Sequence, residues 1–461
     1  MRRWLNAAVT AALLLSGACT TVTTRREKPG PAARPYPPRT HRPAPAQGDS
    51  ASTGGVAVGD SVVGIEEAGG TRMESGTLIK VGVLVDTDAV VVGGPGGLIV
   101  SGIDGREAAR VPAGGSASFT SAGAGSVSID ARGADGTSVA RTVVAAPAVA
   151  RPADGETVTL RGVPYRGEMV VQPSGGGVTA VNRVDIESYL LGVVPRELGP
   201  TGSQYPEAAK AQAVAARTYA VKHLGARSRQ GFDVYASTAD QVYGGVAAEV
   251  PLVTDAVRAT RGEVLVYGGV PIDAYYHSTC GGRTAAIEEV WNQHPVPYLV
   301  SVVDVDPRTG EAYDHMSGRF HWTESWSAPE LEAVLNRTLA DSLHGRTITQ
   351  IRDARVVERT ASGRVRRMLL STDAGDFNLG KDRIRWILLT PRGAVLNSSK
   401  FDVSTTRDAS GDVASMTADG SGWGHGIGMC QFGAIGRALA GQDYRTILNA
   451  YYPGTRLVRA Y

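Results

Sequence analysis

The feature that most constrains this chain is a change in sequence character at Asp185. Before it, short runs rich in β-branched residues are separated by Gly, Pro and Asp turns, which is the pattern of β-strands. These runs are residues 80–85, 89–92, 157–160 and 168–171. After Asp185, segments of helical length and composition begin. We therefore predict an α+β protein, with a β-rich domain over 75–180 placed before a mixed α/β domain over 181–461.

Residues that commonly start or end helices and turns locate the remaining predicted elements. Asp185 is a suitable N-cap, and the helix that it starts should end before Pro195. An Ala-rich helix should begin at Pro206, a favoured first-turn residue, and end near His223. The other expectations are a mobile Gly/Ser/Ala-rich stretch over 113–138, a hairpin at Gly268-Gly269, a helix over 329–342, a hairpin turn at Ser362-Gly363 and a helix over 431–440.

The N-terminus has the features of an export signal. Arg2 and Arg3 precede an apolar run, residues 5–15, that is too short to span a bilayer comfortably. Cleavage after Ala18 would leave Cys19 first, as in lipoproteins whose cysteine is acylated. We predict a signal peptide over 1–18 and an exported protein that Cys19 anchors to a membrane. Since the next residue is not Asp, the outer membrane is favoured over the inner. A secreted protein with a free thiol is the alternative.

Composition bounds the other possibilities. Residues 19–60 are Pro-rich and cannot bury a core, so we predict a disordered tether. The full chain of 461 residues is long enough for two or three domains. Its 47 Lys and Arg residues nearly balance 45 Asp and Glu, which gives no case for a nucleic-acid partner. Three cysteines are too few for a disulfide scaffold.

Three segments carry side chains suited to chemistry. They are YLLGVVPREL (189–198), YYHSTCGGRT (275–284) and GSGWGHGIGMCQFGAIGRAL (420–439). Glu197 follows Pro195, so it is expected on a turn, where most charged residues are only solvated. Trp423 could stack on a sugar ring, and His425 could bind a hydroxyl or orient a carboxylate. The alternative is a buried Gly-rich turn with Trp423 as core.

A possible metal site is also visible in these segments. His277, Cys280, His425 and Cys430 form a His2Cys2 set that could hold a tetrahedral zinc ion. Cys280 and Cys430 could instead form a disulfide, as an oxidising compartment favours, or remain as two buried thiols. The sequence leaves these three alternatives open.

Taken together, these segments resemble the stage II sporulation protein D family, which includes the amidase enhancers. The resemblance rests on four motifs in the family's order: YLLGVVPREL (189–198), AQAVAARTYA (211–220), HSTCGG (277–282) and GWGHGIGMCQFGA (422–434). It is strong over 180–305 and good over 306–461. It is looser over 75–180, and it does not extend to residues 1–60.

The resemblance implies a peptidoglycan lytic transglycosylase that cuts between N-acetylmuramic acid and N-acetylglucosamine and leaves a 1,6-anhydro end. The best-known members prefer glycan stripped of its stem peptides. The family's catalytic Glu corresponds to Glu197, and Leu198 replaces a frequent Met, a volume-conserving change. The expected substrate-cleft residues are Arg217, Tyr219, Tyr276, His277, Ser278, Trp423, His425 and Gln431. Arg217 could equally be a structural ion-pair residue.

The resemblance also bears on cofactors and partners. No cofactor is required by the expected reaction, although some members carry zinc near the turn that corresponds to HSTCGG. The expected partners are peptidoglycan glycan strands, a wall amidase and the membrane that holds the lipid anchor.

Three other readings compete with the transglycosylase. A non-catalytic wall-binding protein that stimulates a separate amidase would bind glycan without cutting it. A water-using muramidase would need a second carboxylate, for which Asp240 is the candidate. A structural envelope lipoprotein would bury Trp423 and His425 and have no cleft around Glu197.

Overall fold

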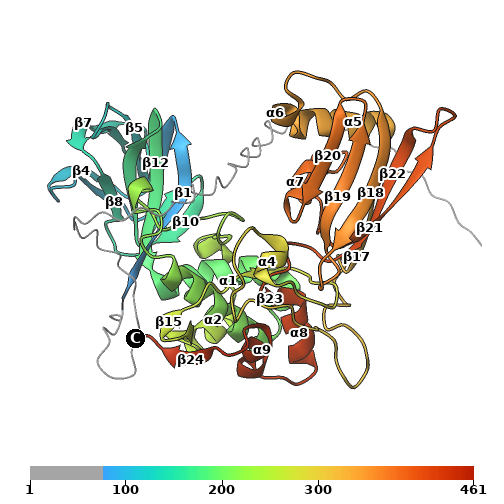
Figure 1. Ribbon diagram of the computed structural model, residues 1–461. Coiled ribbons are helices and arrows are strands. Elements are labelled where there is room, and N and C mark those ends of the chain that lie inside the picture. Colours follow the sequence, from blue (N-terminus) through green and yellow to red (C-terminus); the bar gives the residue numbers. More distant parts are fainter. Residues whose placement is uncertain (1–75) are drawn as a thin grey trace, which may run out of the picture. The chain divides into compact units, whose positions relative to one another are not determined.

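The computed structural model describes residues 76–461, and it confirms the α+β class. The predicted signal peptide, tether and lipidated Cys19 lie outside the described residues. β-strands dominate the part before Asp185, and helices and further strands follow it (Figure 1). Within residues 76–461, no helix combines the length and apolar character needed to cross a membrane.

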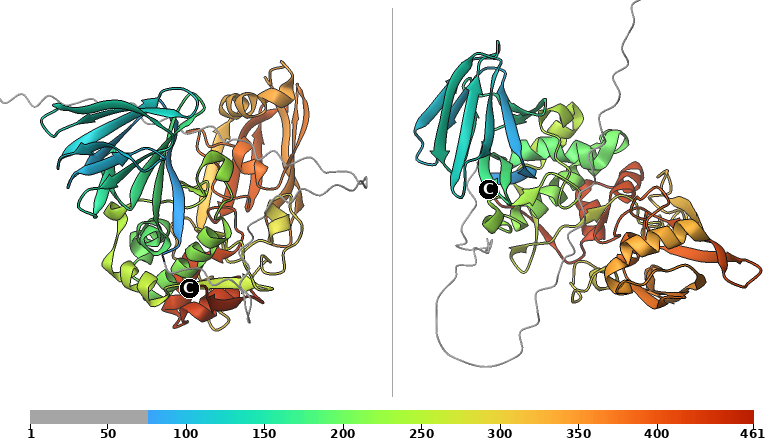
Figure 2. Two further views of the ribbon diagram at one scale, coloured as in Figure 1. Left: turned by 90° about the vertical axis from the view of Figure 1, so that its left-hand side faces the viewer. Right: turned by 90° about the horizontal axis from the view of Figure 1, so that it is seen from above.

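Two sheets form the β-rich part, and their strands pair antiparallel except for β13, which pairs in parallel with β1. The first has the strand order β13-β1-β12-β11-β8-β3-β4 and the second the order β10-β9-β2-β5-β6-β7. The strands are β1 (Leu78–Thr87), β2 (Ala89–Gly94), β3 (Leu98–Ser101), β4 (Glu107–Val111), β5 (Gly115–Ser121), β6 (Ser126–Arg132), β7 (Ser138–Ala145), β8 (Ala148–Pro152), β9 (Thr157–Leu160), β10 (Val163–Arg166), β11 (Glu168–Ser174), β12 (Gly177–Asp185) and β13 (Val234–Tyr235). Their buried residues belong to one core. Figure 2 shows the strands of this part from two further directions.

The stretch over 113–138 is ordered, so the expectation of a mobile segment was wrong. It contains β5 and β6 and leads into β7. Alternate residues of β5 and β6 face inward, and Phe119 and Ile129 pair across the two strands in the core. The many small residues do not prevent this packing. Alternate residues of a strand point to opposite faces of the sheet, and this alternation decides which residues are buried.

Helix α1 (Ile186–Gly202) begins where predicted but does not end before Pro195. The Asp185 carboxylate accepts hydrogen bonds from the backbone N–H groups of Glu187 and Ser188, as an N-cap should. The chain continues through Pro195 to a kink at Gly199, where φ is 66°. Burial of the apolar face, including Val193 and Val194, outweighs the hydrogen bond lost at the proline. Glu197 therefore lies on a helix rather than on a turn.

Helix α2 (Pro206–Lys222) matches the predicted Ala-rich helix, and it is buried along most of its length. Short elements follow it: η1 (Ser228–Gln230), η2 (Val246–Ala248), α3 (Pro251–Ala259), β14 (Glu263–Tyr267), β15 (Val270–Pro271), β16 (Tyr276–His277) and α4 (Ile287–Val290). The hairpin at Gly268-Gly269 joins β14 to β15, as expected. β14 also pairs with β24 (Arg456–Arg459), near the end of the chain.

The segment of the chain between β16 and the C-terminal helices forms two three-stranded sheets that share an apolar core of their own. Their elements are β17 (His321–Ser327), α5 (Ala328–Thr338), α6 (Ala340–Leu343), β18 (Ile351–Arg359), β19 (Val365–Thr372), β20 (Gly375–Gly380), α7 (Arg383–Ile387), β21 (Phe401–Arg407) and β22 (Val413–Ser421). The helix predicted over 329–342 is divided into α5 and α6, and β18 turns into β19 around Ser362-Gly363 as predicted.

The C-terminal elements are β23 (Met429–Cys430), α8 (Gln431–Leu439) and α9 (Tyr444–Tyr451). α8 confirms the helix predicted over 431–440. β23 pairs in parallel with β16, so that Tyr276 is opposite Met429 and His277 is opposite Cys430. This pairing brings the HSTCGG turn beside the Gly-rich 420–428 loop, although the two are far apart in the sequence.

Candidate functional site

Glu197 lies in the last turn of α1 before the Gly199 kink, and two other segments contact it. The backbone N–H of Val242 donates to its Oε1 atom at 2.6 Å. The side-chain amide of Gln431, the first residue of α8, faces its Oε2 atom at 3.4 Å. The carboxylate is thus held by neutral donors from a loop and a helix that are distant in the sequence.

Two tyrosines and a glutamine form a hydrogen-bond network beside this carboxylate. The Tyr189 hydroxyl donates to Gln241 Oε1 at 3.1 Å, and Gln241 Nε2 donates to the Tyr276 hydroxyl oxygen at 2.9 Å. The Tyr276 hydroxyl in turn interacts with Glu197. The Tyr189 side chain is buried, and its hydroxyl is part of the network.

The protein environment of Glu197 favours its protonated form. Burial raises the pKa of the Glu197 carboxyl to about 7. The hydrogen bonds from Val242, Gln431 and Tyr276 act in the opposite direction. The residue as a whole is still partly exposed. A carboxyl group with this pKa is present in both protonation states near neutral pH, so it can donate a proton and later accept one.

Asp240, the candidate second carboxylate, is fully used within the protein. Its Oδ1 atom accepts from the Tyr219 hydroxyl at 2.7 Å and from Arg227 at 3.0 Å, and its Oδ2 atom accepts from the Tyr235 backbone at 2.8 Å. Its side chain is only 1% exposed. Asp240 therefore organises the 219–240 region and is poorly placed to activate a water molecule.

Arg217 does not line a cleft, which corrects the expectation that it binds substrate. Its side chain is 0% exposed and makes a two-pronged ion pair with Glu187, both contacts at 2.8 Å. It also donates to the backbone carbonyls of Val257 and Glu263. The structural alternative is the one that the geometry supports. Tyr219 is similarly engaged: its ring stacks on His223 and its hydroxyl donates to Asp240.

His425 has both ring nitrogens bound to backbone. Nδ1 accepts from the Ile427 N–H at 3.0 Å, so Nε2 carries the proton and donates to the Tyr276 carbonyl at 3.0 Å. Burial lowers the pKa of His425 to about 4, so the ring is neutral. It is therefore unavailable as a zinc ligand or as a carboxylate partner, contrary to expectation. Instead it fixes the backbone of Tyr276.

The other expected cleft residues have mixed positions. Trp423 is partly exposed, but the guanidinium of Arg319 lies 3.6 Å from its ring centre and covers one face. Ser278 is partly exposed, and its hydroxyl is 3.2 Å from that of Thr279. Gln431 contacts Glu197 directly. The structure thus brings Tyr276 and Gln431 to Glu197.

Residues that the sequence analysis missed complete this arrangement. The Gln241 side chain and the Val242 N–H both serve the Glu197 site. Trp291 packs on the aromatic residues next to Tyr276 and its backbone contact: its ring centre is 4.9 Å from that of Tyr275 and 5.2 Å from that of His425. The polar and aromatic run DQVYGG (240–245), which ends in two glycines, was the available signal.

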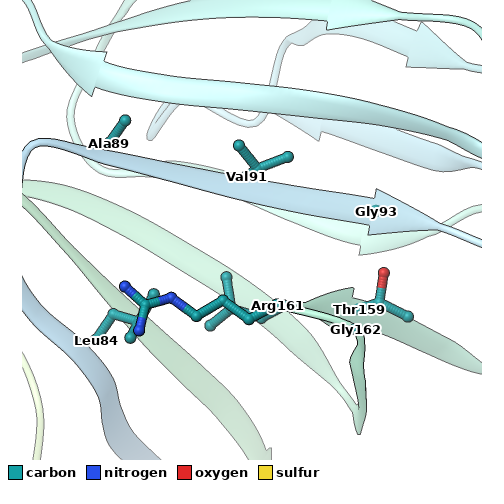
Figure 3. A pocket seen from close by; sticks show the side chains of 8 residues that line it. Leu84, Ala89, Val91, Gly93, Thr159, Arg161 and Gly162 are labelled. Carbon is teal, nitrogen blue, oxygen red and sulfur yellow. The ribbon is translucent and has the colours of Figure 1, made fainter. Parts of the chain in front are cut away.

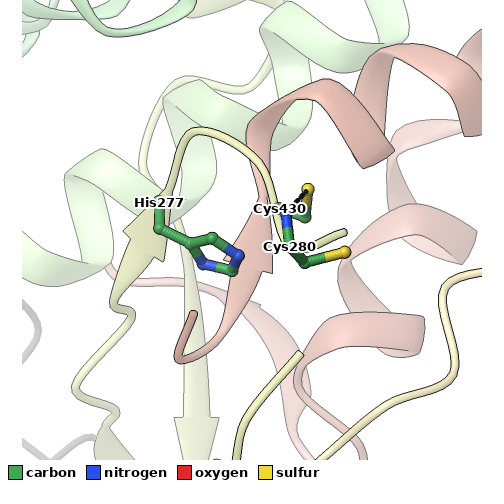
Figure 4. A group of neighbouring side chains, drawn as sticks. All are labelled: His277, Cys280 and Cys430. Carbon is green, nitrogen blue, oxygen red and sulfur yellow. Dashed lines mark hydrogen bonds between the residues drawn. The ribbon is translucent and has the colours of Figure 1, made fainter. Parts of the chain in front are cut away.

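His277, Cys280 and Cys430 converge in the interior (Figure 4), with one ligand atom of each within 4.8 Å of the others. His277 Nδ1 contacts the Ile427 carbonyl, whereas its buried Nε2 has no hydrogen-bond partner. Burial raises the pKa of Cys280, and that of Cys430 to about 12. Both are free thiols in the structure and form no disulfide.

Two buried aspartates adjoin these thiols and were also missed. Asp304 and Asp314 each lie close to Cys280, which makes a second group of possible ligand atoms. The Asp314 carboxylate accepts from the backbone N–H groups of Cys280, Gly281 and Gly282. Two thiols, an unpartnered imidazole nitrogen and nearby carboxylates are a donor set that suits zinc.

A shallow hollow on the β-rich part is separate from these groups (Figure 3). It is lined by Leu84, Ala89, Val91, Gly93, Thr159, Leu160, Arg161 and Gly162. Arg161 is its charged lining residue, and it contains none of the expected site residues.

Comparisons with known proteins identify the family of the chain. The family model described as Stage II sporulation protein matches residues 174–267, and a domain of unknown function (DUF8618) matches residues 308–428. Stage II sporulation protein D of Bacillus subtilis is 30% identical, over 61% of this chain and 76% of that protein. The chain belongs to the stage II sporulation protein D family.

Two further relatives cover different shares of their own lengths. An uncharacterized protein of Brachyspira hyodysenteriae is 34% identical, over 65% of this chain and 74% of the relative. The amidase enhancer of Bacillus subtilis is 36% identical over 58% of this chain, which spans only 40% of the enhancer.

Replacing Arg217 by Met should destabilise the fold by about 3–5 kcal/mol, because Glu187 would remain buried without its cation. Urea unfolding measures this loss, and the double variant Arg217→Met/Glu187→Met should recover a large part of it. If Arg217→Met instead keeps wild-type stability but loses glycan binding, the structural role is wrong.

Glu197→Gln should change how stability depends on pH. Because the folded-state pKa of Glu197 is raised, wild-type folding loses stability as pH rises from about 4.5 to about 7. The Gln variant lacks this loss, so its stability relative to wild type should increase over that window by roughly 1–3 kcal/mol. Urea unfolding between pH 4 and pH 8 gives the difference.

Glu330→Gln is a control for which the pH dependence of stability should have the opposite sign. Hydrogen bonds from the backbone and hydroxyl of Ser327 lower the pKa of Glu330, so the stability that it contributes is lost as pH falls. A wild-type minus Glu197→Gln difference that does not vary with pH would contradict the raised pKa.

Proposed function

We propose that this protein is a peptidoglycan lytic transglycosylase, with Glu197 as its single acid/base residue. The observation that carries the proposal is a carboxyl group on a partly exposed residue, held by neutral donors, whose pKa burial raises to about 7. The family membership and the expected position of the family's catalytic Glu support the same residue. The substrate is a glycan strand of alternating N-acetylmuramic acid and N-acetylglucosamine.

The proposed reaction uses one carboxyl group twice. Protonated Glu197 donates its proton to the glycosidic oxygen as the bond to C1 of N-acetylmuramic acid breaks. The 6-hydroxyl oxygen of the same sugar then attacks C1, and its proton passes to the Glu197 carboxylate. The product carries a 1,6-anhydro ring, no water is consumed and Glu197 is regenerated. The occupied state of Asp240 is consistent with a mechanism that needs no second carboxylate.

A non-catalytic glycan-binding protein that stimulates an amidase is the second candidate. The 36% identity to a protein named amidase enhancer favours it. In that case a wall amidase would be the partner, and Glu197 would not be needed. For both candidate functions we propose an exported protein that Cys19 anchors to a membrane of the cell envelope. The outer membrane is favoured over the inner one.

Digestion of purified glycan by the purified chain separates the candidates. Peptide-bearing and amidase-stripped strands should be compared, with products identified by mass spectrometry. We expect anhydro-ended fragments, mainly from stripped strands, at a rate that falls as pH rises through about 7. Glu197→Gln should reduce the rate by at least about a hundredfold.

Glu332→Gln is the matched control, because burial also raises the pKa of Glu332 but this residue lies on α5. It should digest glycan at the wild-type rate. Reducing ends in place of anhydro ends would indicate a muramidase. Binding of both glycans without any cleavage would favour the enhancer.

We also propose that His277, Cys280 and Cys430 hold a structural zinc ion, with Asp304 or Asp314 as a further ligand. A bound ion would keep the buried thiols deprotonated and would fix the HSTCGG turn against β23. None of the proposed proton-transfer steps involves it.

Metal analysis of the purified chain tests this site. We expect about one zinc per chain, strongly reduced by Cys280→Ser and by Cys430→Ser. His425→Asn should keep the ion, because both nitrogens of His425 are bound to backbone. Zinc-free wild-type protein that is folded would contradict the proposal.

A further inference from the structure

Adjacent residues of one loop act on the same carboxyl group in two ways. The backbone N–H of Val242 donates directly to Glu197 at 2.6 Å. The side chain of the preceding Gln241, which is 0% exposed, instead contacts the two tyrosines of the network. Because one short segment carries both functions, the position of Glu197 and the hydrogen bonding of the tyrosines are coupled.

The orientation of the Gln241 amide follows from its partners. One of its contacts is the backbone carbonyl of Ala216 at 3.3 Å, and a carbonyl oxygen can only accept. The NH2 group must therefore face Ala216 and Tyr276, which leaves Oε1 to face Tyr189. Tyr189 must then donate its hydroxyl proton to Gln241.

This orientation also determines the direction of the Tyr276 hydroxyl. Its oxygen accepts a hydrogen bond from Gln241, so its single proton is free to point elsewhere. The Glu197 carboxylate is the acceptor beside it. The backbone of Tyr276 is fixed from the other side, where His425 Nε2 donates to its carbonyl. Donation by Gln241 also strengthens Tyr276 as a donor, because linked hydrogen bonds polarise one another.

We propose that Gln241 is a positioning residue that turns the Tyr276 hydroxyl toward Glu197 and so holds the reactive carboxyl group in place. The proposal rests on the proposed function only in treating Glu197 as the reactive group. Gln241 does not touch substrate in this scheme and acts through Tyr276. The Tyr276 hydroxyl, the Gln431 amide and the Val242 N–H face the carboxyl group. Tyr189 interacts with it only electrostatically, and Asp240 is paired with Arg227.

The test measures the titration of Glu197 itself, by infrared difference spectra of the full chain with Glu197→Gln as the subtraction reference. Tyr276→Phe removes a donor to the carboxylate and should raise the pKa of Glu197 by about one. Gln241→Leu should raise it in the same direction by a smaller amount. In the Tyr276→Phe background, Gln241→Leu should cause no further change, because Gln241 acts through the missing hydroxyl.

Two additional variants keep the result interpretable. Gln241→Glu preserves the shape but presents an acceptor to Tyr276, so it should also raise the pKa of Glu197 even if the Leu variant folds poorly. Asn336→Leu removes another amide that bridges backbone, at Ile348, and should lower stability without moving the titration.

Each outcome decides the proposal. An equal effect of Gln241→Leu with and without the Tyr276 hydroxyl, or no effect in either background, would overturn it. If the expected shifts are seen but the wild-type chain cuts no glycan, the positioning role holds and the transglycosylase assignment fails.

Discussion

The site depends on the parallel pairing of two short strands, β16 and β23, that lie about 150 residues apart in the chain. This pairing places Tyr276 at the start of one strand and Gln431 directly after the other, and both reach Glu197. It also aligns His277 with Cys430. Without it, the carboxyl group would lose two of its neutral donors and the thiol cluster would lose its imidazole. The sheets over 321–421 are inserted between these strands and leave the pairing intact.

Glycines make this close approach possible. A Cβ atom at Gly428 would lie 2.0 Å from the Tyr275 carbonyl oxygen, and one at Gly424 would lie 2.9 Å from the His277 Cβ atom. Both residues also have positive φ, at 69° and 106°, which other residues rarely adopt. Glycine is therefore required in this loop by its close contact with Tyr275 and His277, and the loop carries Trp423 and His425 on either side of Gly424.

The same constraints explain why a destabilising group is kept at the centre. Burying a carboxyl group lowers stability at neutral pH, because its folded-state pKa is raised. The Arg217–Glu187 pair differs. Burial raises the pKa of Glu187, but the interactions with Arg217, Tyr461 and Gly262 together lower it by a larger amount, so the pKa of Glu187 is below its usual value. One buried carboxylate is thus fixed by a cation to support the fold. The other has only neutral partners, which leaves it able to exchange a proton.

The sequence by itself determined the α+β class, the N-cap at Asp185, the Ala-rich helix and the family resemblance, because these depend on local periodicity and on motifs contiguous in the chain. It also singled out Glu197, but not as a helical residue, since the rule that proline ends a helix is local and tertiary packing overrode it. Only the tertiary structure decided that Arg217 is an ion-pair residue, that His425 is bound to backbone and that Gln241 belongs to the site. Those roles depend on hydrogen bonds between segments that are distant in the sequence, where side-chain type does not specify the partner.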